Sequence, residues 1–146
     1  METLIIYDTQ NGNTKQAAET MGEALGCAVR PATEVNSADL EGVVRLVVGS
    51  PTHGGQMTEP VSALLKSAPS LEGVKVAAFD TRTDVFMNRL LPWGYAAPKI
   101  AKRLTACGGT LVVEPEGFIV LGMQGPLKEG ELARAAAWAE ELAAQG

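Results

Sequence analysis

The 146 residues suffice for one domain with a single core, and a content of 46% hydrophobic and 20% charged residues excludes a disordered chain. The formal net charge of −5 disfavours nucleic acids and anionic membranes as partners and favours a partner with a basic surface. Two cysteines far apart in the chain and a single histidine indicate neither a disulfide framework nor a zinc site.

Short apolar segments predict the strands of a sheet. Segments that are apolar at most successive positions are typical of parallel strands covered by helices on both faces. No segment approaches the ~20 residues that cross a bilayer, and the N-terminal residues lack the basic region of a signal peptide, so we expect a cytoplasmic protein. The predicted strands are residues 4–7, 28–30 as a weaker edge strand, 43–48, 74–79 and 111–120, the last one interrupted at 114–117.

Helix patterns alternate with these strands. The first begins at Thr14, the second near Pro60 and the third at about Ala97, and the last spans residues 129–144. The alternation predicts right-handed βαβ units, and therefore an α/β fold with a doubly wound parallel sheet in one domain over residues 1–146. Ligands of such sheets bind beyond the carboxyl ends of the strands, so a site is expected in the loops that follow the strands.

The loop after the first strand has the composition of an anion site. The N–H groups at the start of a helix have no internal partners, and the helix dipole places partial positive charge there, so they can hold a phosphate. Thr9 and Thr14 add hydroxyl donors, Asn11 and Asn13 add amide donors, and Gly12 lets the backbone approach the anion. A plain turn followed by a helix N-cap favours the same residue types, so this loop by itself leaves both interpretations open.

The same loop resembles the phosphate signature of the flavodoxin family. That signature reads Thr/Ser-x-Thr-Gly-Asn-Thr, and residues 9–14 match it except at Asn11, where the family more often has Thr. The segment 118–132 is similar to the closing strand and helix of the family, so the resemblance covers essentially the whole chain, and the short interruption at 114–117 fits the short-chain form. The resemblance implies a flavodoxin-like five-stranded parallel sheet in the order 2-1-3-4-5 and one non-covalently bound FMN.

A second segment, residues 49–55, is similar to the family segment Gly-Ser-Pro-Thr-Tyr-Gly-Gly that runs along the isoalloxazine ring. His53 stands at the usual aromatic position, and we expect it to contact the flavin rather than to act as a catalyst. The peptide between Gly54 and Gly55 can adopt two orientations at low cost because glycine tolerates positive φ. The resemblance implies that this peptide flips to hydrogen-bond N5 of the half-reduced flavin.

A long segment, residues 80–95, follows the fourth predicted strand and carries three of the aromatic residues of the chain. We expect at least one aromatic ring to contact the flavin, with Trp93 the first candidate and Tyr95 the second. The alternative is that these side chains cover the end of the sheet or form a patch that binds a partner. Arg82 and Arg89 could approach the pyrimidine oxygens of a flavin, pair with carboxylates or face solvent. The residues predicted to bind FMN are Thr9, Gln10, Asn11, Gly12, Asn13, Thr14, Ser50, Pro51, Thr52, His53, Gly54, Gly55, Asp80, Thr81, Arg82, Trp93 and Tyr95.

Two functions are compatible with an FMN site. The first is an electron carrier between redox partner proteins, which would be a monomer or weak dimer that docks on basic surfaces. The alternative is an FMN-dependent NAD(P)H:acceptor (quinone) oxidoreductase, which the sequence supports little because no Gly-x-Gly-x-x-Gly follows a strand. A phosphoryl receiver is excluded because Gly49 and Ser50 follow the third strand instead of a phosphoacceptor aspartate, and no P-loop motif is present.

Overall fold

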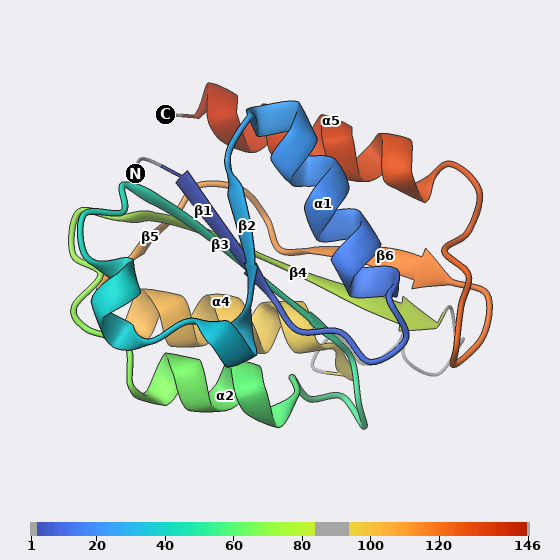
Figure 1. Cartoon of the computed structure of the whole chain (residues 1–146), viewed down its shortest axis with the longest axis horizontal. Helices are drawn as coiled ribbons and strands as arrows, with labels where there is room; N and C mark the ends of the chain where they lie inside the picture. The colour runs from blue at the N-terminus through green and yellow to red at the C-terminus, as the bar shows by residue number, and fades with distance from the viewer. Residues whose placement is uncertain (1–2, 84–93, 146) are drawn as a thin grey trace.

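The apolar segments form one sheet whose strands all pair in parallel. The computed structural model describes residues 3–83 and 94–145. The strands are β1 (Thr3–Tyr7), β2 (Ala28–Pro31), β3 (Arg45–Pro51), β4 (Lys75–Thr83), β5 (Thr110–Leu111) and β6 (Glu116–Val120). Their order is β2-β1-β3-β4-β5, with β6 also paired to β4, which confirms the predicted doubly wound sheet (Figure 1).

The fifth position of the sheet is divided between two strands. β5 pairs with the first residues of β4, and β6 pairs with its last five. Pro115 lies between β5 and β6, and proline has no N–H to donate to a neighbouring strand. The interruption predicted within residues 111–120 is therefore present, although the strand resumes at Glu116 rather than after residue 117.

Two helical layers enclose the sheet. The helices are α1 (Asn13–Leu25), the 3-10 turns η1 (Ala32–Glu34) and η2 (Ser37–Leu40), α2 (Glu59–Lys66), α4 (Ala96–Ala106) and α5 (Glu131–Ala144). α1 and α5 lie on one face, and α2 and α4 on the other (Figure 1). None of the helices in the described ranges is long and apolar enough to cross a membrane.

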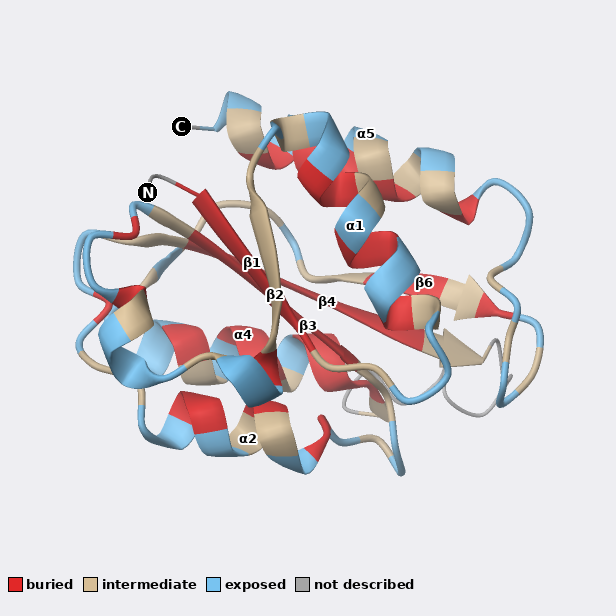
Figure 2. Ribbon diagram, viewed as in Figure 1, coloured by how far each residue is buried: buried red, intermediate tan, exposed pale blue. Residues whose placement is uncertain are grey.

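Alternation along the strands supplies a hydrophobic core to each layer. On β3, Leu46 and Val48 pack in the core beneath α2 and α4, whereas Val47 packs in the core beneath α1 and α5. Figure 2 shows the buried residues concentrated on the strands and on the inner faces of the helices. Both faces of the sheet are thus sealed, which leaves the strand ends as the place where polar groups can gather.

β4 is longer than the sequence predicts. The segment 74–79 is extended through Thr83, because residues 79–83 pair with residues 116–120 of β6. Asp80, Thr81 and Arg82 therefore belong to a strand rather than to the loop after it. Since side chains alternate along a strand, Asp80 and Arg82 point to one side of the sheet and Thr81 to the other.

Candidate functional site

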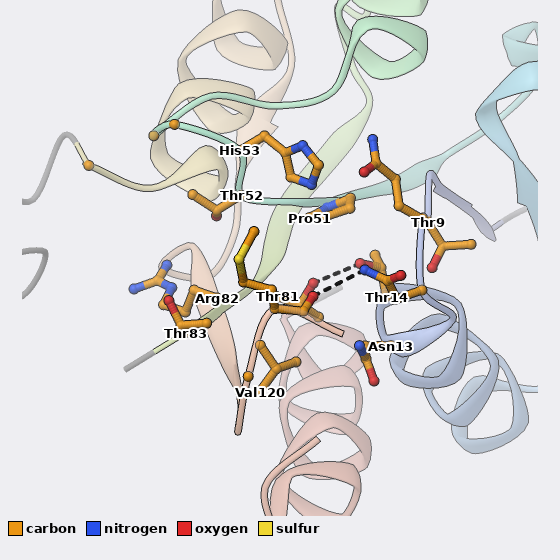
Figure 3. Close-up of a pocket in the computed structure, with 17 residues that line it drawn as sticks. Thr9, Asn13, Thr14, Pro51, Thr52, His53, Thr81, Arg82, Thr83 and Val120 are labelled. Carbon is orange, nitrogen blue, oxygen red and sulfur yellow. Dashed lines mark hydrogen bonds between the residues drawn. The ribbon is translucent and has the colours of Figure 1, made fainter. Parts of the chain in front are cut away.

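A cavity of about 790 Å³ opens at the carboxyl edge of the sheet, where the topology predicts a ligand (Figure 3). Its volume is in the range that holds small ligands and cofactors. Five parts of the chain form its wall: the β1–α1 loop with the start of α1, the segment after β3, the end of β4, Gly94 before α4, and the end of β6 with the segment after it. The lining residues are Thr9, Gln10, Asn11, Asn13, Thr14, Pro51, Thr52, His53, Gly54, Gly55, Thr81, Arg82, Thr83, Gly94, Val120, Gly122 and Met123.

The start of α1 is open to an anion. Gly12 precedes the helix with φ 87°, and no side chain among residues 3–83 and 94–145 caps the helix. The first turn contains no acidic residue, so nothing there neutralises the positive end of the helix dipole. The N–H of Gly12 donates to Oγ1 of Thr9 over 3.0 Å, which closes the loop and uses the Thr9 hydroxyl as an acceptor, so that its hydrogen is not consumed by this bond.

Contacts from two other segments fix this loop in place. The hydroxyls of Thr14 and Thr81 are joined by a buried hydrogen bond of 2.8 Å (Figure 3). Nδ2 of Asn11 donates to the carbonyl of Met123 over 3.0 Å. The α-carbon of Gly125 packs so closely on Asn13 that an added Cβ would lie 2.5 Å from its Oδ1. The loop is thus held in one conformation by β4 and by the segment after β6.

The segment after β3 forms a tight turn. His53 and Gln56 exchange two backbone hydrogen bonds of 2.9 Å, and Gly54 and Gly55 between them have φ values of 55° and 79°. Two successive positive φ values are what a type I′ turn requires, and they favour glycine at both positions. Nζ of Lys99 donates to the carbonyl of Gly55, so α4 holds the turn against the cavity.

Ser50 and Thr52 act mainly on neighbouring helices. Ser50 is fully buried, accepts the N–H of Thr58 over 3.0 Å and donates to the carbonyl of Pro51 over 2.8 Å. Oγ1 of Thr52 accepts the N–H of Ala96 at the start of α4 over 3.2 Å. These contacts position the segment after β3 relative to α2 and α4.

Asp80, Arg82 and Tyr95 form a connected group beside the cavity. Nε and Nη2 of Arg82 donate to the two carboxylate oxygens of Asp80 over 2.7 and 2.8 Å. The guanidinium lies 3.4 Å from the centroid of the Tyr95 ring, a cation–π distance. On another side it packs on Gly117, where an added Cβ would lie 2.1 Å from Cζ of Arg82.

Asp80 also serves the neighbouring helix. Its side chain is fully buried, and Oδ2 accepts the N–H of Ala97 in the first turn of α4 over 2.8 Å. Burial raises the pKa of Asp80 above its usual value, while the hydrogen bonds and charge of Arg82 oppose that shift. The carboxylate therefore depends on Arg82 for most of its stabilisation, and the ion pair is one unit.

The predicted site residues fall into three groups. Twelve of the seventeen line the cavity: Thr9, Gln10, Asn11, Asn13, Thr14, Pro51, Thr52, His53, Gly54, Gly55, Thr81 and Arg82. Gly12, Ser50, Asp80 and Tyr95 do not line it; the last three are buried beside it, and Arg82 covers one face of the Tyr95 ring. Trp93 lies outside the described residues, as does Arg89.

Five lining residues were missed: Thr83, Gly94, Val120, Gly122 and Met123. Three of them end or follow β6, and the rule that ligands bind beyond the carboxyl ends of the strands would have found them. Thr83 lies in the same segment as the predicted Thr81 and Arg82, and its pairing with Val120 at the end of β6 brings it to the cavity. In the described ranges no three His, Cys, Asp or Glu side chains gather as a metal site.

Comparison with known proteins identifies both fold and family. A family model described as "Flavodoxin domain" matches residues 4–84, which are 81 of the 146 residues. Oxidised flavodoxin 2 from Bacillus cereus is similar with a TM-score of 0.84 and 21% identity, covering 100% of both chains. Oxidised flavodoxin 1 from the same organism is similar with a TM-score of 0.82 and 16% identity, covering 99% of this chain and 98% of that chain.

The fold also occurs within a larger enzyme. Rubredoxin oxygen:oxidoreductase from Desulfovibrio gigas gives a TM-score of 0.76 at 18% identity over 99% of this chain but 36% of that chain. A search of curated proteins finds no match. Since the family model covers more than half of the sequence and the sheet order agrees, the chain belongs to the flavodoxin family.

Proposed function

We propose that the chain binds one FMN in this cavity and carries electrons between redox partner proteins. Flavodoxins are flavoproteins that transfer electrons to such partners, and this chain is a member of the family. The observation that carries the proposal is the start of α1, which opens into the cavity without a side-chain cap and without an acidic residue. A phosphate at that position would satisfy N–H groups of the first helical turn, which have no partners within the helix.

We assign the phosphate to the loop of residues 9–14. The N–H groups of the first turn of α1 supply the backbone donors, and the amides of Asn11 and Asn13 line the same wall. Thr9 retains a hydroxyl hydrogen for a phosphate oxygen because its oxygen already accepts the N–H of Gly12. Hydrogen bonds to a charged phosphate are stronger than those between neutral groups, so few donors suffice.

The isoalloxazine ring is assigned to the rest of the cavity, away from that loop. His53, Gly54 and Gly55 form one wall there, and Arg82 and Thr83 form another (Figure 3). Trp93 and Tyr95 stay predictions as ring contacts. When bound, FMN supplies the electron-transfer chemistry, while this chain orients the ring and sets the charges around it.

The phosphate assignment is tested by comparing two flavins. Protein freed of flavin is titrated with FMN and with riboflavin, and the visible spectrum and flavin fluorescence are recorded. Two or more hydrogen bonds to a charged group predict that FMN binds about 100-fold more tightly than riboflavin. Equal affinity for the two flavins, or no uptake of either, would refute the proposal.

The carrier function is tested with the loaded protein. NADH or NADPH is added together with a quinone, and oxidation of the nucleotide is followed by absorbance. We expect no sustained turnover without a second protein. Rapid multiple turnover would favour the FMN-dependent oxidoreductase. A single domain over residues 1–146, a cytoplasmic location, a monomeric or weakly dimeric state and a partner with a basic docking surface stay predictions.

A further inference from the structure

Arg82 carries a positive charge that is fixed at the cavity wall. Two of its nitrogens bind Asp80, its flat face lies on Tyr95, and Gly117 packs against it. The side chain is only 18% exposed. A guanidinium is always charged in proteins and is planar, so these three contacts determine both its position and its orientation.

Arg82 lies at the end of the cavity that faces away from the phosphate loop. In Figure 3, Thr9, Asn13 and Thr14 lie on one side of the cavity, and Arg82 lies on the other with Thr52 and Thr83. A flavin whose phosphate is held by residues 9–14 extends its ring toward this second side. In that orientation the Arg82 guanidinium is close to the isoalloxazine ring, which is reduced, and far from the phosphate, which is already charged.

One end of the guanidinium makes no hydrogen bond within the described part of the chain. Nε and Nη2 are bonded to Asp80, whereas Nη1 has no hydrogen-bond acceptor among residues 3–83 and 94–145. Asp80 is fully buried and lies behind the lining residues, while Arg82 is one of them. The ion pair therefore presents its positive member to the cavity, even though the pair as a whole is neutral.

We propose that Arg82 raises the reduction potential of FMN bound in this cavity, with Asp80 limiting that effect. The inference rests on the proposed function. Two electrons and one proton convert the neutral oxidised ring into an anion, so a nearby positive charge stabilises the reduced form more than the oxidised form. In the cell the electrons come from a redox partner protein, and in the assay they come from dithionite, with the proton taken from water.

Because Asp80 and Arg82 carry opposite charges, removing the charge of each is expected to shift the potential in opposite directions. Asp80→Asn keeps an oxygen that can accept the N–H of Ala97 but removes the compensating charge, so it is expected to raise the potential. Asp80→Asn combined with Arg82→Met removes both charges without leaving a buried unpaired carboxylate. A comparison of this double variant with Asp80→Asn therefore isolates the charge of Arg82.

The experiment is an anaerobic dithionite titration of the loaded proteins against a reference dye, together with the dissociation constants of oxidised FMN. We expect the ratio of the affinity for reduced FMN to the affinity for oxidised FMN to be at least tenfold lower in the double variant than in Asp80→Asn. For a two-electron couple this corresponds to a potential about 30 mV lower. Arg30→Met is the matched control, since Arg30 pairs with Asp39 on the exposed edge of the sheet and does not line the cavity.

The outcomes separate this inference from the function on which it rests. The inference is supported if Asp80→Asn raises the reduction potential, the added Arg82→Met lowers it again, and Arg30→Met leaves it unchanged. If the variants take up FMN but the potentials of Asp80→Asn and of the double variant equal that of Arg30→Met, the role of Arg82 is overturned and the FMN site remains supported. Failure of the unmodified protein to take up FMN overturns both.

Discussion

The hydroxyls of Thr14 and Thr81 meet in a buried hydrogen bond of 2.8 Å although the two residues are 67 positions apart. Thr14 lies in the first turn of α1 and Thr81 lies on β4, and both line the cavity. The bond therefore ties the proposed phosphate site to the strand that also carries Asp80 and Arg82. The contact restricts movement of the start of α1 relative to β4.

The Thr14–Thr81 bond predicts non-additive losses of stability. Thr14→Val or Thr81→Val alone leaves a buried hydroxyl without its partner and is expected to lower the free energy of unfolding by about 1–2 kcal/mol. The double variant removes both hydroxyls and should cost little more than either single change. Urea unfolding of the flavin-free proteins measures all three values. Losses that simply add would show that the two hydroxyls do not interact.

Gly12→Ala is expected to weaken FMN binding through the backbone. Gly12 has φ 87°, where an alanine is strained by roughly 1–2 kcal/mol, although an added Cβ would meet no atom within 4 Å. Relief of that strain would rotate the N–H groups at the start of α1, so we expect the affinity for FMN to fall about tenfold or more. Fluorescence titration measures this change.

The matched control is Gly42→Ala. Gly42 has φ 79° and equally open surroundings, but it does not line the cavity. It should lose similar stability and keep the affinity for FMN. If both variants bind FMN like the unmodified protein, Gly12 is a turn residue only.

The layers of the fold could be predicted because the spacing of apolar residues within each segment indicates which positions are buried. β1 and the centre of β3, residues 46–48, are apolar, and the helix patterns carry apolar residues at helical spacing. The alternation of strands and helices is therefore predictable without tertiary information. The β1–α1 loop was equally local, since Gly12 and its polar neighbours act within one turn of chain. Family resemblance then gave the sheet order, which propensity alone does not determine.

The end of β4 could not be predicted in this way. Residues 80–83 are polar, and they are extended only because β6, more than thirty positions later, pairs with them. The contacts of Arg82 with Asp80, Tyr95 and Gly117 follow from that pairing, so the sequence left salt bridge, solvent and flavin as open alternatives for Arg82. The structure assigns it the salt bridge, and the flavin contact stays a prediction.

Glu131 is expected to make stability fall at low pH. Its carboxylate accepts hydrogen bonds from Arg134 and, over 2.7 Å, from the N–H of Ile119, which joins α5 to β6. The hydrogen bond from Arg134 is the main cause of a pKa below the usual value of 4.5. Because the folded state favours the deprotonated form, this stabilisation is complete above pH 4.5 and is lost as the pH falls through the lowered pKa.

Glu131→Gln should therefore be less stable than the unmodified protein at pH 7, by about 1–3 kcal/mol, and should lose less stability on acidification. Urea unfolding between pH 7 and pH 3 measures both effects. Glu129→Gln removes the same charge from an exposed position two residues earlier and should behave like the unmodified protein. An unchanged acid dependence in Glu131→Gln would contradict the assignment.

Gly125→Ala tests whether the segment after β6 shapes the proposed phosphate site. Gly125 does not line the cavity, but an added Cβ would lie 2.5 Å from Oδ1 of Asn13 and would displace that side chain. We expect FMN affinity to fall severalfold while riboflavin affinity changes little, because the displaced amide is at the phosphate end.

Gly130→Ala is the matched control. Gly130 has a similar positive φ, 91° against 97° for Gly125, with no atom within 4 Å of the added Cβ. It should show the backbone cost in unfolding experiments without the change in FMN affinity. Equal losses of FMN affinity in the two variants would mean that strain, and not the position of Asn13, controls binding.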